Sequence, residues 1–445
     1  MPKITHRKKR LSSFKLIVLG FAGVIVLGAL ILMLPFSSTA GVVTPFHEAL
    51  FTSTSAVCVT GLVVQDTGSY WSAFGQTVIL LLIQIGGLGV VTVAALFAML
   101  SGRKISLMQR STMQDAISAP KVGGIVRLTR FIVRGTFLIE LIGMIVMLPT
   151  FCGKFGIKGI WMAAFHSISA FCNAGFDILG TAENKYSSLT GYIGEPTINI
   201  AIMLLIIVGG IGFLTWDDIY TNKWHFKKYR MQSKVILVTT AILIIVPAVF
   251  FFFCDFTGLP LAERILASLF QSVTPRTAGF NTADLPAMTG SSKAIMTLLM
   301  LVGGSPGSTA GGMKTTTLAV LILSAFSVCR KKDDAEVCGR RIDGSAVKNA
   351  AAVAVMYFLL FFVGGIVIST AEGLPLSTCL YETASAVGTV GLTLGITPQL
   401  GVLSQLILIV LMYLGRVGGL TLIYAAVSNK NQSGAKLPLE KITVG

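Results

Sequence analysis

The residues whose spacing is most typical of a functional site are hydroxyl side chains that precede a glycine, in a pattern that occurs four times. Each copy has an aromatic residue, then Ser or Thr two and four positions later, and then a Gly followed by Phe or Leu. The copies lie at Ala49–Leu62, Ala163–Phe176, Ala267–Phe280 and Thr378–Leu392. Their marker residues are Phe51, Ser53, Ser55 and Gly61; Phe165, Ser167, Ser169 and Gly175; Phe270, Ser272, Thr274 and Gly279; and Tyr381, Thr383, Ser385 and Gly391. Because the glycines recur at intervals of about 110 residues, the chain is predicted to contain four versions of one unit.

The stretch before each glycine differs in side-chain type from copy to copy, which indicates chemistry by the main chain. A catalytic site needs particular side chains, whereas a site built from backbone carbonyls tolerates this variety. Four such stretches around one axis bring rings of carbonyl oxygens together, and such rings replace the water shell of a cation. Glycine permits the dihedral angles that aim carbonyls inward. The predicted filter residues are Val57, Cys58, Val59, Thr60 and Gly61; Cys172, Asn173, Ala174 and Gly175; Arg276, Thr277, Ala278 and Gly279; and Gly388, Thr389, Val390 and Gly391.

The composition places this site in a membrane. Of the 445 residues 53% are hydrophobic and 12% charged, whereas a soluble protein carries roughly 25% charged residues. The net charge of +16 comes from basic residues that lie between apolar runs. That pattern is typical of membrane topology rather than of nucleic-acid binding, so no nucleic-acid partner is expected. The first run, Leu16–Phe36, is too long for the apolar part of a signal peptide and predicts a retained helix, although Ser38-Thr39-Ala40 has the composition of a cleavage site.

The elements that position the glycine stretches are predicted to be two apolar helices and one short helix per unit. The first runs are Leu16–Phe36, Phe131–Thr150, Val235–Cys254 and Ala350–Thr370, and the second runs are Thr77–Leu100, Ile198–Trp216, Ala294–Cys329 and Val402–Val427. Each is close to the ~20 residues of a membrane-spanning helix or longer. Stretches between them, such as Pro45–Val57 and Gly159–Phe171, are too short and polar to cross, and suit half-helices that enter the membrane and turn back. Their partly negative C-terminal ends favour cations.

The expected fold is therefore an all-α membrane protein with eight spanning helices and four re-entrant half-helices around a pseudo-fourfold pore. The units are placed at 16–105, 106–222, 223–333 and 334–430, between tails at 1–15 and 431–445. Lysine and arginine gather at 3–10, 103–130, 223–234 and 330–348, so both termini and all joints between units are predicted to be cytoplasmic. Two spanning helices per unit make the four units parallel rather than inverted.

One of the four stretches carries a resemblance to known proteins. Thr389-Val390-Gly391 resembles the first part of the TVGYG filter of potassium channels. The whole arrangement, over essentially the entire chain, resembles the Trk/Ktr/HKT superfamily, and in particular the membrane subunit of bacterial Ktr potassium transporters. The resemblance implies that the four glycines form the filter. In that family a serine at the first of these positions goes with a preference for sodium, so Gly61 implies a preference for potassium. It further implies a homodimer in the bacterial plasma membrane, controlled by a cytosolic ring of nucleotide-binding (RCK/KTN-type) subunits docked on the basic joints.

The second run of the third unit contains a polar interruption at 303–317, GGSPGSTAGGMKTTT. A continuous membrane helix does not accommodate this composition and a proline. A phosphate-binding loop is the alternative, but Met313 stands where its lysine is required. The interpretation is a broken helix with its loop below the filter, and the resemblance implies that this loop is the gate: Gly303, Gly304, Ser305, Pro306, Gly307, Ser308, Thr309, Ala310, Gly311, Gly312 and the flanking Lys314. Glycine clusters at 86–89, 209–212 and 418–419 are expected to let helices pack closely.

Charged residues inside apolar runs are functional candidates. Arg416 is either a strut that binds carbonyls or acids, or a charge below the filter that touches the gate loop; the resemblance implies the second. Arg276 is expected to point behind the filter and bond loop carbonyls, with Asp177, Asp284 or Glu382 as partners. Glu140 is interpreted as an interhelical hydrogen-bond partner.

Two other functions compete with passive potassium uptake. A secondary carrier that couples potassium to sodium or protons needs acidic residues at the membrane midplane, for which Glu140 is the candidate. A membrane enzyme needs clustered His, Asp or Glu, which the sequence does not provide, so the chain is not expected to be an enzyme. With no nucleotide motif, disulfide framework or metal-ligand spacing, no cofactor is expected in this chain, and potassium is the substrate.

Overall fold

The computed structural model describes residues 12–101, 105–117, 121, 123–419, 421 and 440. Most of the predicted tails at 1–15 and 431–445, together with Arg103 and Lys104, lie outside these residues. Within the described part the chain is mainly helical, and it includes a hairpin of β1 (Glu336–Val337) and β2 (Arg340–Arg341), which pair antiparallel.

Long apolar helices begin the four predicted units: α1 (Ser13–Leu32), α6 (Ile125–Phe155), α10 (Met231–Cys254) and α14 (Gly344–Glu372). Each is long and apolar enough to cross a membrane, since a helix rising about 1.5 Å per residue needs roughly 20 residues for the apolar core of a bilayer. Only 28% to 33% of the residues in their apolar windows are buried inside the protein. Such extensive apolar surface is stable in lipid, and the predicted first runs are confirmed as long apolar helices.

Each long helix is followed by a short helix that leads into a glycine stretch: α2 (Phe46–Cys58), α7 (Lys158–Phe171), α11 (Leu261–Val273) and α15 (Leu376–Gly388). The first hydroxyl residue of each motif ties the short helix to the long helix before it, because its side chain donates a hydrogen bond to a backbone carbonyl there. The four bonds are Ser53 Oγ to Ile25 O (2.7 Å), Ser167 Oγ to Glu140 O (2.6 Å), Ser272 Oγ to Ile244 O (2.5 Å) and Thr383 Oγ1 to Phe361 O (3.1 Å).

A third set of helices follows the glycine stretches: α3 (Ala73–Leu88), α8 (Pro196–Gly210), α12 (Gly290–Leu301) and α16 (Val402–Val417). The single helices predicted over Thr77–Leu100 and Ile198–Trp216 are each divided in two. Helix α3 meets α4 (Val90–Leu100) at 95°, and α8 meets α9 (Phe213–Asn222) at 98°. The bends occur at Gly89 (φ 84°) and Gly212 (φ 91°), because glycine adopts positive φ without steric cost.

The glycine clusters also provide the close packing that the sequence predicted. A Cβ atom on Gly86 would collide with the carbonyl oxygen of Val57, and one on Gly209 with that of Phe171. The third helix of a unit therefore packs backbone to backbone against the end of its own short helix. The bend is an additional role of these clusters that the sequence analysis missed.

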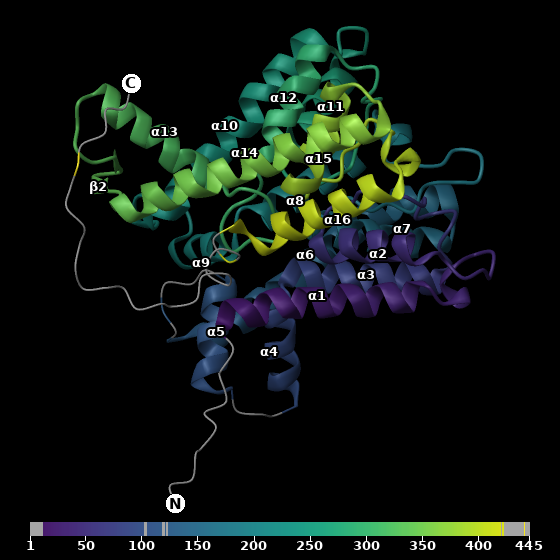
Figure 1. Ribbon diagram of the computed structural model, residues 1–445, viewed down its shortest axis with the longest axis horizontal. Coiled ribbons are helices and arrows are strands. Elements are labelled where there is room, and N and C mark those ends of the chain that lie inside the picture. The colour runs from purple at the N-terminus through teal and green to yellow at the C-terminus, as the bar shows by residue number, and fades with distance from the viewer. Residues whose placement is uncertain are drawn as a thin grey trace, which may run out of the picture.

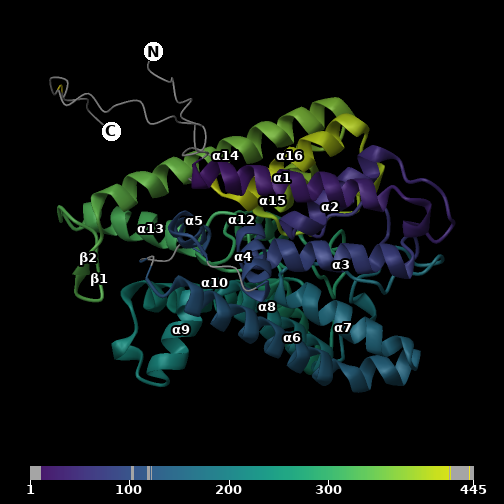
Figure 2. The same ribbon diagram turned by 90° about the horizontal axis from the view of Figure 1, so that it is seen from below.

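The core of the protein is centred on the four motifs. Residues 51–62, 169–176, 270–280 and 381–392 are all buried. Figure 1 shows α2, α15 and α16 between α1 and α14, and α13 (Thr315–Cys329) next to the hairpin. Figures 1 and 2 both place the hairpin, α9 and α5 (Leu107–Ile117), which join successive units, toward the left end of the molecule.

Candidate functional site

The backbone just before each motif glycine has the same unusual conformation in all four copies. The residue two positions before the glycine has a left-handed conformation: Val59 (φ 58°), Asn173 (58°), Thr277 (65°) and Thr389 (52°). The glycines themselves have φ between 68° and 96°. A left-handed β-branched residue is a steric outlier that persists only when its surroundings enforce it, and such residues gather at functional sites.

The four glycines pack against one another's stretches in a closed cycle. Each faces the carbonyl oxygen of the residue that precedes the next glycine, and the fourth faces the first. The contacts join Gly61 to Ala174 O, Gly175 to Ala278 O, Gly279 to Val390 O and Gly391 to Thr60 O. A Cβ on Gly175 would lie 2.6 Å from Ala278 O, and one on Gly279 would lie 2.5 Å from Val390 O. No side chain fits at these positions. The structure thus brings together the predicted stretches, which lie about 110 residues apart in sequence.

The carbonyl oxygens in this ring are left without donors. Among the described residues, no hydrogen bond is donated to the carbonyl of Thr60, Ala174, Ala278 or Val390, although all four residues are buried. Nearly all buried carbonyls in proteins have a partner, and an exception calls for an explanation such as an ion. Converging free oxygens are the ligand set that a dehydrated monovalent cation requires.

The second hydroxyl of each motif holds its stretch in one of two ways. In the first and fourth copies it accepts a hydrogen bond from the glycine itself, Gly61 N to Ser55 Oγ and Gly391 N to Ser385 Oγ, both 3.0 Å. In the second and third it donates to the residue after the glycine, Ser169 Oγ to Phe176 O (2.7 Å) and Thr274 Oγ1 to Phe280 O. The third copy is also one residue shorter between its aromatic residue and its glycine than the other three copies. The four-fold pattern predicted from the sequence did not include this difference.

A cavity of about 210 Å³ opens on one side of the ring, and all four glycines line it together with Asp66 and Asp177. Asp66 accepts hydrogen bonds from Ser69 N (2.8 Å), Ser69 Oγ (2.7 Å) and Tyr186 N (2.8 Å). Burial, followed by the negative charge of Asp66, raises the pKa of Asp177 to about 7. Asp66 and Asp177 give the mouth of the ring an acidic lining, which attracts cations, although the raised pKa reduces the share of that charge carried by Asp177. Sequence reasoning passed over Asp66, although it lies shortly after Gly61.

Arg276 does not make the contacts predicted for it. Among the described residues its side chain forms no ion pair with Asp177, Asp284 or Glu382, and its Nε atom lacks a hydrogen-bond partner. The oxygens of Glu382 are occupied by neutral donors of the segment that follows Gly391. Arg276 is 4% exposed, and its own carbonyl lies 3.4 Å from Asn173 Nδ2.

The polar interruption in the third unit forms an extended loop, 302–314, between α12 and α13, and it lies against the predicted filter stretches. Thr309 Oγ1 donates to Phe171 O (3.1 Å) and lies 2.9 Å from Asn173 Oδ1. Two glycines of the loop are close to the fourth stretch, Gly311 to the Thr389 side chain and Gly312 to the Gly388 carbonyl. A third, Gly303, is close to Thr277. The broken helix predicted here is therefore observed.

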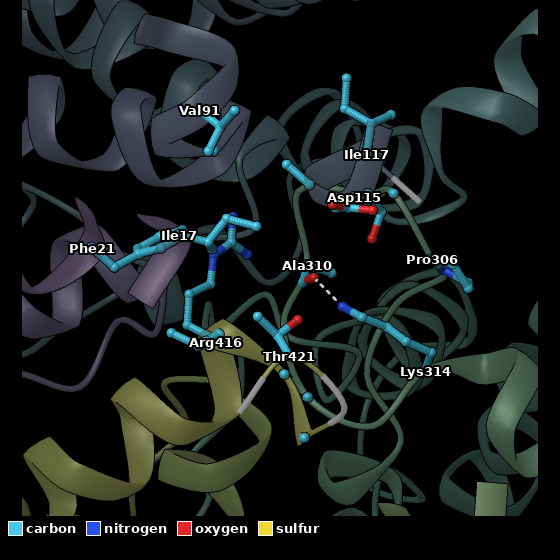
Figure 3. A pocket seen from close by; sticks show the side chains of 18 of the residues that line it. Ile17, Phe21, Val91, Asp115, Ile117, Pro306, Ala310, Lys314, Arg416 and Thr421 are labelled. Carbon is cyan, nitrogen blue, oxygen red and sulfur yellow. Dashed lines mark hydrogen bonds between the residues drawn. The ribbon is translucent and has the colours of Figure 1, made fainter. Parts of the chain in front are cut away.

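Two cationic side chains hold three consecutive carbonyls of this loop. Arg416 donates to Thr309 O and, on the other side, to Gly86 O and Gly87 O of α3. Lys314 Nζ donates to Ala310 O (2.8 Å) and Gly311 O (3.3 Å). Figure 3 shows Arg416 and Lys314 on opposite sides of Ala310. Neither has a carboxylate within ion-pair distance in the described part of the chain. Both features considered for Arg416, the carbonyl strut and the contact with the loop, are thus present.

A second cavity, of about 230 Å³, lies on the side of the loop away from the ring. Arg416, Lys314 and Asp115 line it together with Pro306 and Gly312 (Figure 3). The two cavities are therefore separated by the ring and by the loop with its two bound cations.

Glu140 makes the interhelical contact predicted for it. Its carboxyl group accepts hydrogen bonds from Gln84 Nε2 of α3 (3.0 and 3.4 Å), and Cys172 Sγ lies 3.9 Å away. Glu140 is 4% exposed and is not among the residues that line the two cavities on either side of the ring.

Comparison with known proteins agrees with this arrangement. Residues 13–434 match the model of the family described as TrkH, cation transport protein. The chain is 39% identical to the potassium/sodium uptake protein NtpJ of Enterococcus hirae, with 98% of each chain covered. It is 37% identical to the Ktr system potassium uptake protein B of Bacillus subtilis, over 97% of this chain and 96% of that protein. Its fold is similar to the crystal structure of the potassium transporter TrkH from Vibrio parahaemolyticus, with a TM-score of 0.74 at 19% identity, over 96% of this chain and 87% of that one. The chain therefore belongs to the TrkH family of cation transport proteins.

Proposed function

We propose that this chain takes up potassium ions across the bacterial plasma membrane through a filter of backbone carbonyls. The observation that carries the proposal is the closed cycle of four glycines and four carbonyl oxygens, which accept no hydrogen bond from the residues that the structure describes. A ring of this kind replaces the water shell of a dehydrated cation. The relatives named as potassium uptake proteins support potassium as the substrate, and Gly61 fits the potassium-selective form of the filter.

The pore is formed by four parallel units, at 16–105, 106–222, 223–333 and 334–430. The recurrence of one hydroxyl-to-carbonyl bond in each unit supports this division. In each unit the short helix is a re-entrant half-helix, and the helices on either side of it cross the bilayer, which gives eight crossings. Both tails and all joints are cytoplasmic, as the basic residues at the joints favour, and the cavity beside Asp66 and Asp177 opens to the outside.

Loop 303–314 is the gate, together with Lys314 and Arg416. In the proposed closed state the loop blocks the path below the filter, and the binding of three of its carbonyls by two cationic groups supports this role. Those charges oppose a potassium ion that leaves the ring. Opening requires the loop to move away, and its glycine and serine content suits such a movement.

Flow is driven by the membrane potential, which contributes about 2.3 kcal/mol per charge per 100 mV. Control by nucleotides then comes from separate cytosolic subunits of RCK/KTN type, docked as a ring on the basic joints of a homodimer. The exposed basic residues Arg340 and Arg341 of the hairpin suit such a contact.

The alternative is a carrier that couples potassium to sodium or protons. The name of the Enterococcus hirae relative, a potassium/sodium uptake protein, is the observation that favours it. The position of Glu140, bonded to Gln84 and away from both cavities, argues against it. Isotope flux with and without a sodium gradient separates the two, since a coupled carrier loses potassium uptake when the gradient is removed.

The filter is tested by replacing Gly61, Gly175, Gly279 and Gly391 with Ser, one at a time, and measuring potassium and sodium uptake at equal amounts of membrane-inserted protein. Each Cβ would enter the space of a carbonyl oxygen of the next stretch, so the potassium-to-sodium uptake ratio should fall by about tenfold or more, equivalent to about 1.4 kcal/mol or more. Four variants with the ratio of the unaltered protein would refute the proposal.

A further inference from the structure

The residue that follows the motif aromatic occupies the same place on all four short helices. These residues are Thr52, His166, Gln271 and Glu382, and each is fully buried. Their side chains differ in what they bind. Thr52 Oγ1 and both polar atoms of the Gln271 amide have no hydrogen-bond partner among the described residues, and His166 uses Nδ1 within its own helix, 2.8 Å from Met162 O. Among the described residues, Glu382 is the one of these four whose side chain forms hydrogen bonds beyond its own helix.

Both carboxyl oxygens of Glu382 accept hydrogen bonds from the segment that follows the fourth filter glycine. Oε1 accepts from Thr393 Oγ1 (2.6 Å) and from Leu394 N (2.9 Å), while Oε2 accepts from Thr397 Oγ1 (2.7 Å). Thr397 Oγ1 also lies 3.1 Å from Thr393 Oγ1, which closes the network. All three donors are neutral, and in this network the carboxyl group acts purely as an acceptor.

The segment held by Glu382 begins two residues beyond Gly391 and forms part of the mouth of the ring. Thr393, Gly395, Pro398 and Gln399 line the same cavity as the four filter glycines. Just before Gly391, the carbonyl of Val390 faces Gly279 in the ring. The fourth stretch is therefore held at Gly391 by Ser385, whose Oγ accepts from Gly391 N, and the segment that follows Gly391 is held by Glu382.

The neighbouring stretches are tethered at the outside by other means. In the first unit Asp66 holds Ser69 and Tyr186. In the third unit Asn281 is paired with the preceding loop, through Leu189 N to Asn281 O (3.0 Å) and Asn281 N to Ser188 Oγ (3.1 Å). The matched position on α11, Gln271, contributes nothing to that tether.

We propose that Glu382 is a positioning residue for ion selectivity, which fixes the outer end of the fourth filter stretch and so sets the place of the Val390 carbonyl in the ring. The inference rests on the filter proposed above. Three hydrogen bonds join the Glu382 carboxyl group to this segment, and a filter discriminates ions by the spacing and field of its carbonyls. Losing the anchor therefore changes the preference between ions before it changes the fold.

The test compares two isosteric substitutions at equivalent positions, Glu382→Met and Gln271→Met, in the full-length chain reconstituted in lipid vesicles. Initial uptake of rubidium, as a potassium tracer, and of sodium is measured with both ions at the same concentration. Glu382→Met should lower the rubidium-to-sodium ratio by about tenfold, because it removes the three hydrogen bonds that hold the segment. Gln271→Met should leave the rubidium-to-sodium ratio unchanged. Glu382→Gln keeps an acceptor for Thr393 and Leu394, so it should retain most of the selectivity for rubidium over sodium.

An unchanged ratio in Glu382→Met, or an equal fall in Gln271→Met, would overturn the inference. If Glu382→Met is not recovered in the membrane, Thr397→Val is measured in its place, because it removes one donor to the Glu382 carboxyl group. The rubidium-to-sodium ratio should then fall by about twofold to threefold. An unchanged ratio in Thr397→Val would refute the proposal. Gly391→Ser is measured alongside. A loss of selectivity there, without one in Glu382→Met, refutes the role of Glu382 and leaves the filter standing; no loss in either refutes the filter itself.

Discussion

The ring of filter stretches and the loop beneath it present the same chemical group, the backbone carbonyl, in two different states. In the ring, the carbonyls of Thr60, Ala174, Ala278 and Val390 accept no hydrogen bond in the described structure. In the loop, the carbonyls of three consecutive residues, 309–311, are bound by Arg416 and Lys314. The first arrangement leaves oxygens free for a cation, and the second satisfies them with cations that belong to the protein.

The two regions also differ in how they are held. Each ring stretch is held by a hydroxyl group of its own short helix, such as Ser55 with Gly61, in addition to contacts with neighbouring units such as Asn173 Nδ2 to Arg276 O. The loop is held partly by other units, through Arg416 of α16 and through Ser305 N, which donates to Gly210 O of α8 (2.9 Å). A part held by its neighbours moves when they move, whereas the ring keeps its shape. We therefore propose that the ring provides selectivity and the loop provides regulation.

The largest effect is expected from deleting Ser305–Gly312, which removes the loop and leaves the ring. Uptake of potassium should rise about a hundredfold, equivalent to about 2.7 kcal/mol of barrier, and should no longer respond to regulation, while the potassium-to-sodium ratio stays near that of the unaltered chain. Isotope uptake into vesicles at equal protein measures both quantities. Unchanged, still regulated flux would refute the gate, and a lost ratio would show that the two regions are not separable.

Substituting Arg416→Gln should raise potassium uptake by about tenfold, because a fixed charge is removed from the path and the tie between loop and α3 is lost. Arg264→Gln is the matched control, since Arg264 Nε donates to the Phe252 carbonyl (2.8 Å) away from the loop. If the Arg416→Gln variant takes up potassium at the rate of the unaltered chain, Arg416 is a structural strut and not part of the gate.

A smaller increase, about threefold, is expected from Lys314→Met. Lys314 binds carbonyls of its own loop and, in the part of the chain that the structure describes, makes no hydrogen bond to another unit. Its loss therefore removes a charge but leaves the loop tied through Arg416. Lys293→Met serves as the control, because Lys293 Nζ donates to Pro286 O (2.6 Å) at an exposed site. If Lys314→Met raises uptake more than Arg416→Gln, the order of the two restraints proposed here is wrong.

The smallest effect on transport is expected from Ser53→Ala in the ring's support. It removes the bond from Ser53 Oγ to Ile25 O and should lower the free energy of unfolding by about 1 kcal/mol. Thermal unfolding in detergent, compared with Thr77→Val at an exposed intrahelical bond, measures the loss. A change in flux with no change in stability would contradict the supporting role.

The sequence was sufficient to predict the parts that depend on local chemistry. The repeat of Gly61, Gly175, Gly279 and Gly391 predicted that the four stretches come together, which their closed cycle of contacts confirms; that they act through main-chain oxygens stays a prediction. The polar interruption at 303–317 predicted a break in the third helix, and the loop is observed at 302–314. Glu140 was interpreted correctly, since an isolated carboxyl in an apolar helix needs a hydrogen-bond partner.

Features that depend on tertiary contacts could not be predicted in this way. The bends at Gly89 and Gly212 resemble ordinary packing glycines in sequence, because both roles use a small residue. The predicted partners of Arg276 were wrong. The carboxyl group of Glu382, one of those partners, already accepts hydrogen bonds from Thr393, Leu394 and Thr397, which lie shortly after it in the chain. Charge matching alone cannot reveal that a carboxyl group is satisfied by hydroxyl and amide groups.

The most direct test of the central claim is to locate a potassium surrogate in the protein by anomalous scattering from crystals of the full-length chain grown in rubidium or thallium salts. We predict a peak on the axis between Gly61, Gly175, Gly279 and Gly391, within coordination distance of the carbonyl oxygens of Thr60, Ala174, Ala278 and Val390. A ring without a peak, with the ion bound at Glu140 or another acidic side chain instead, would contradict it.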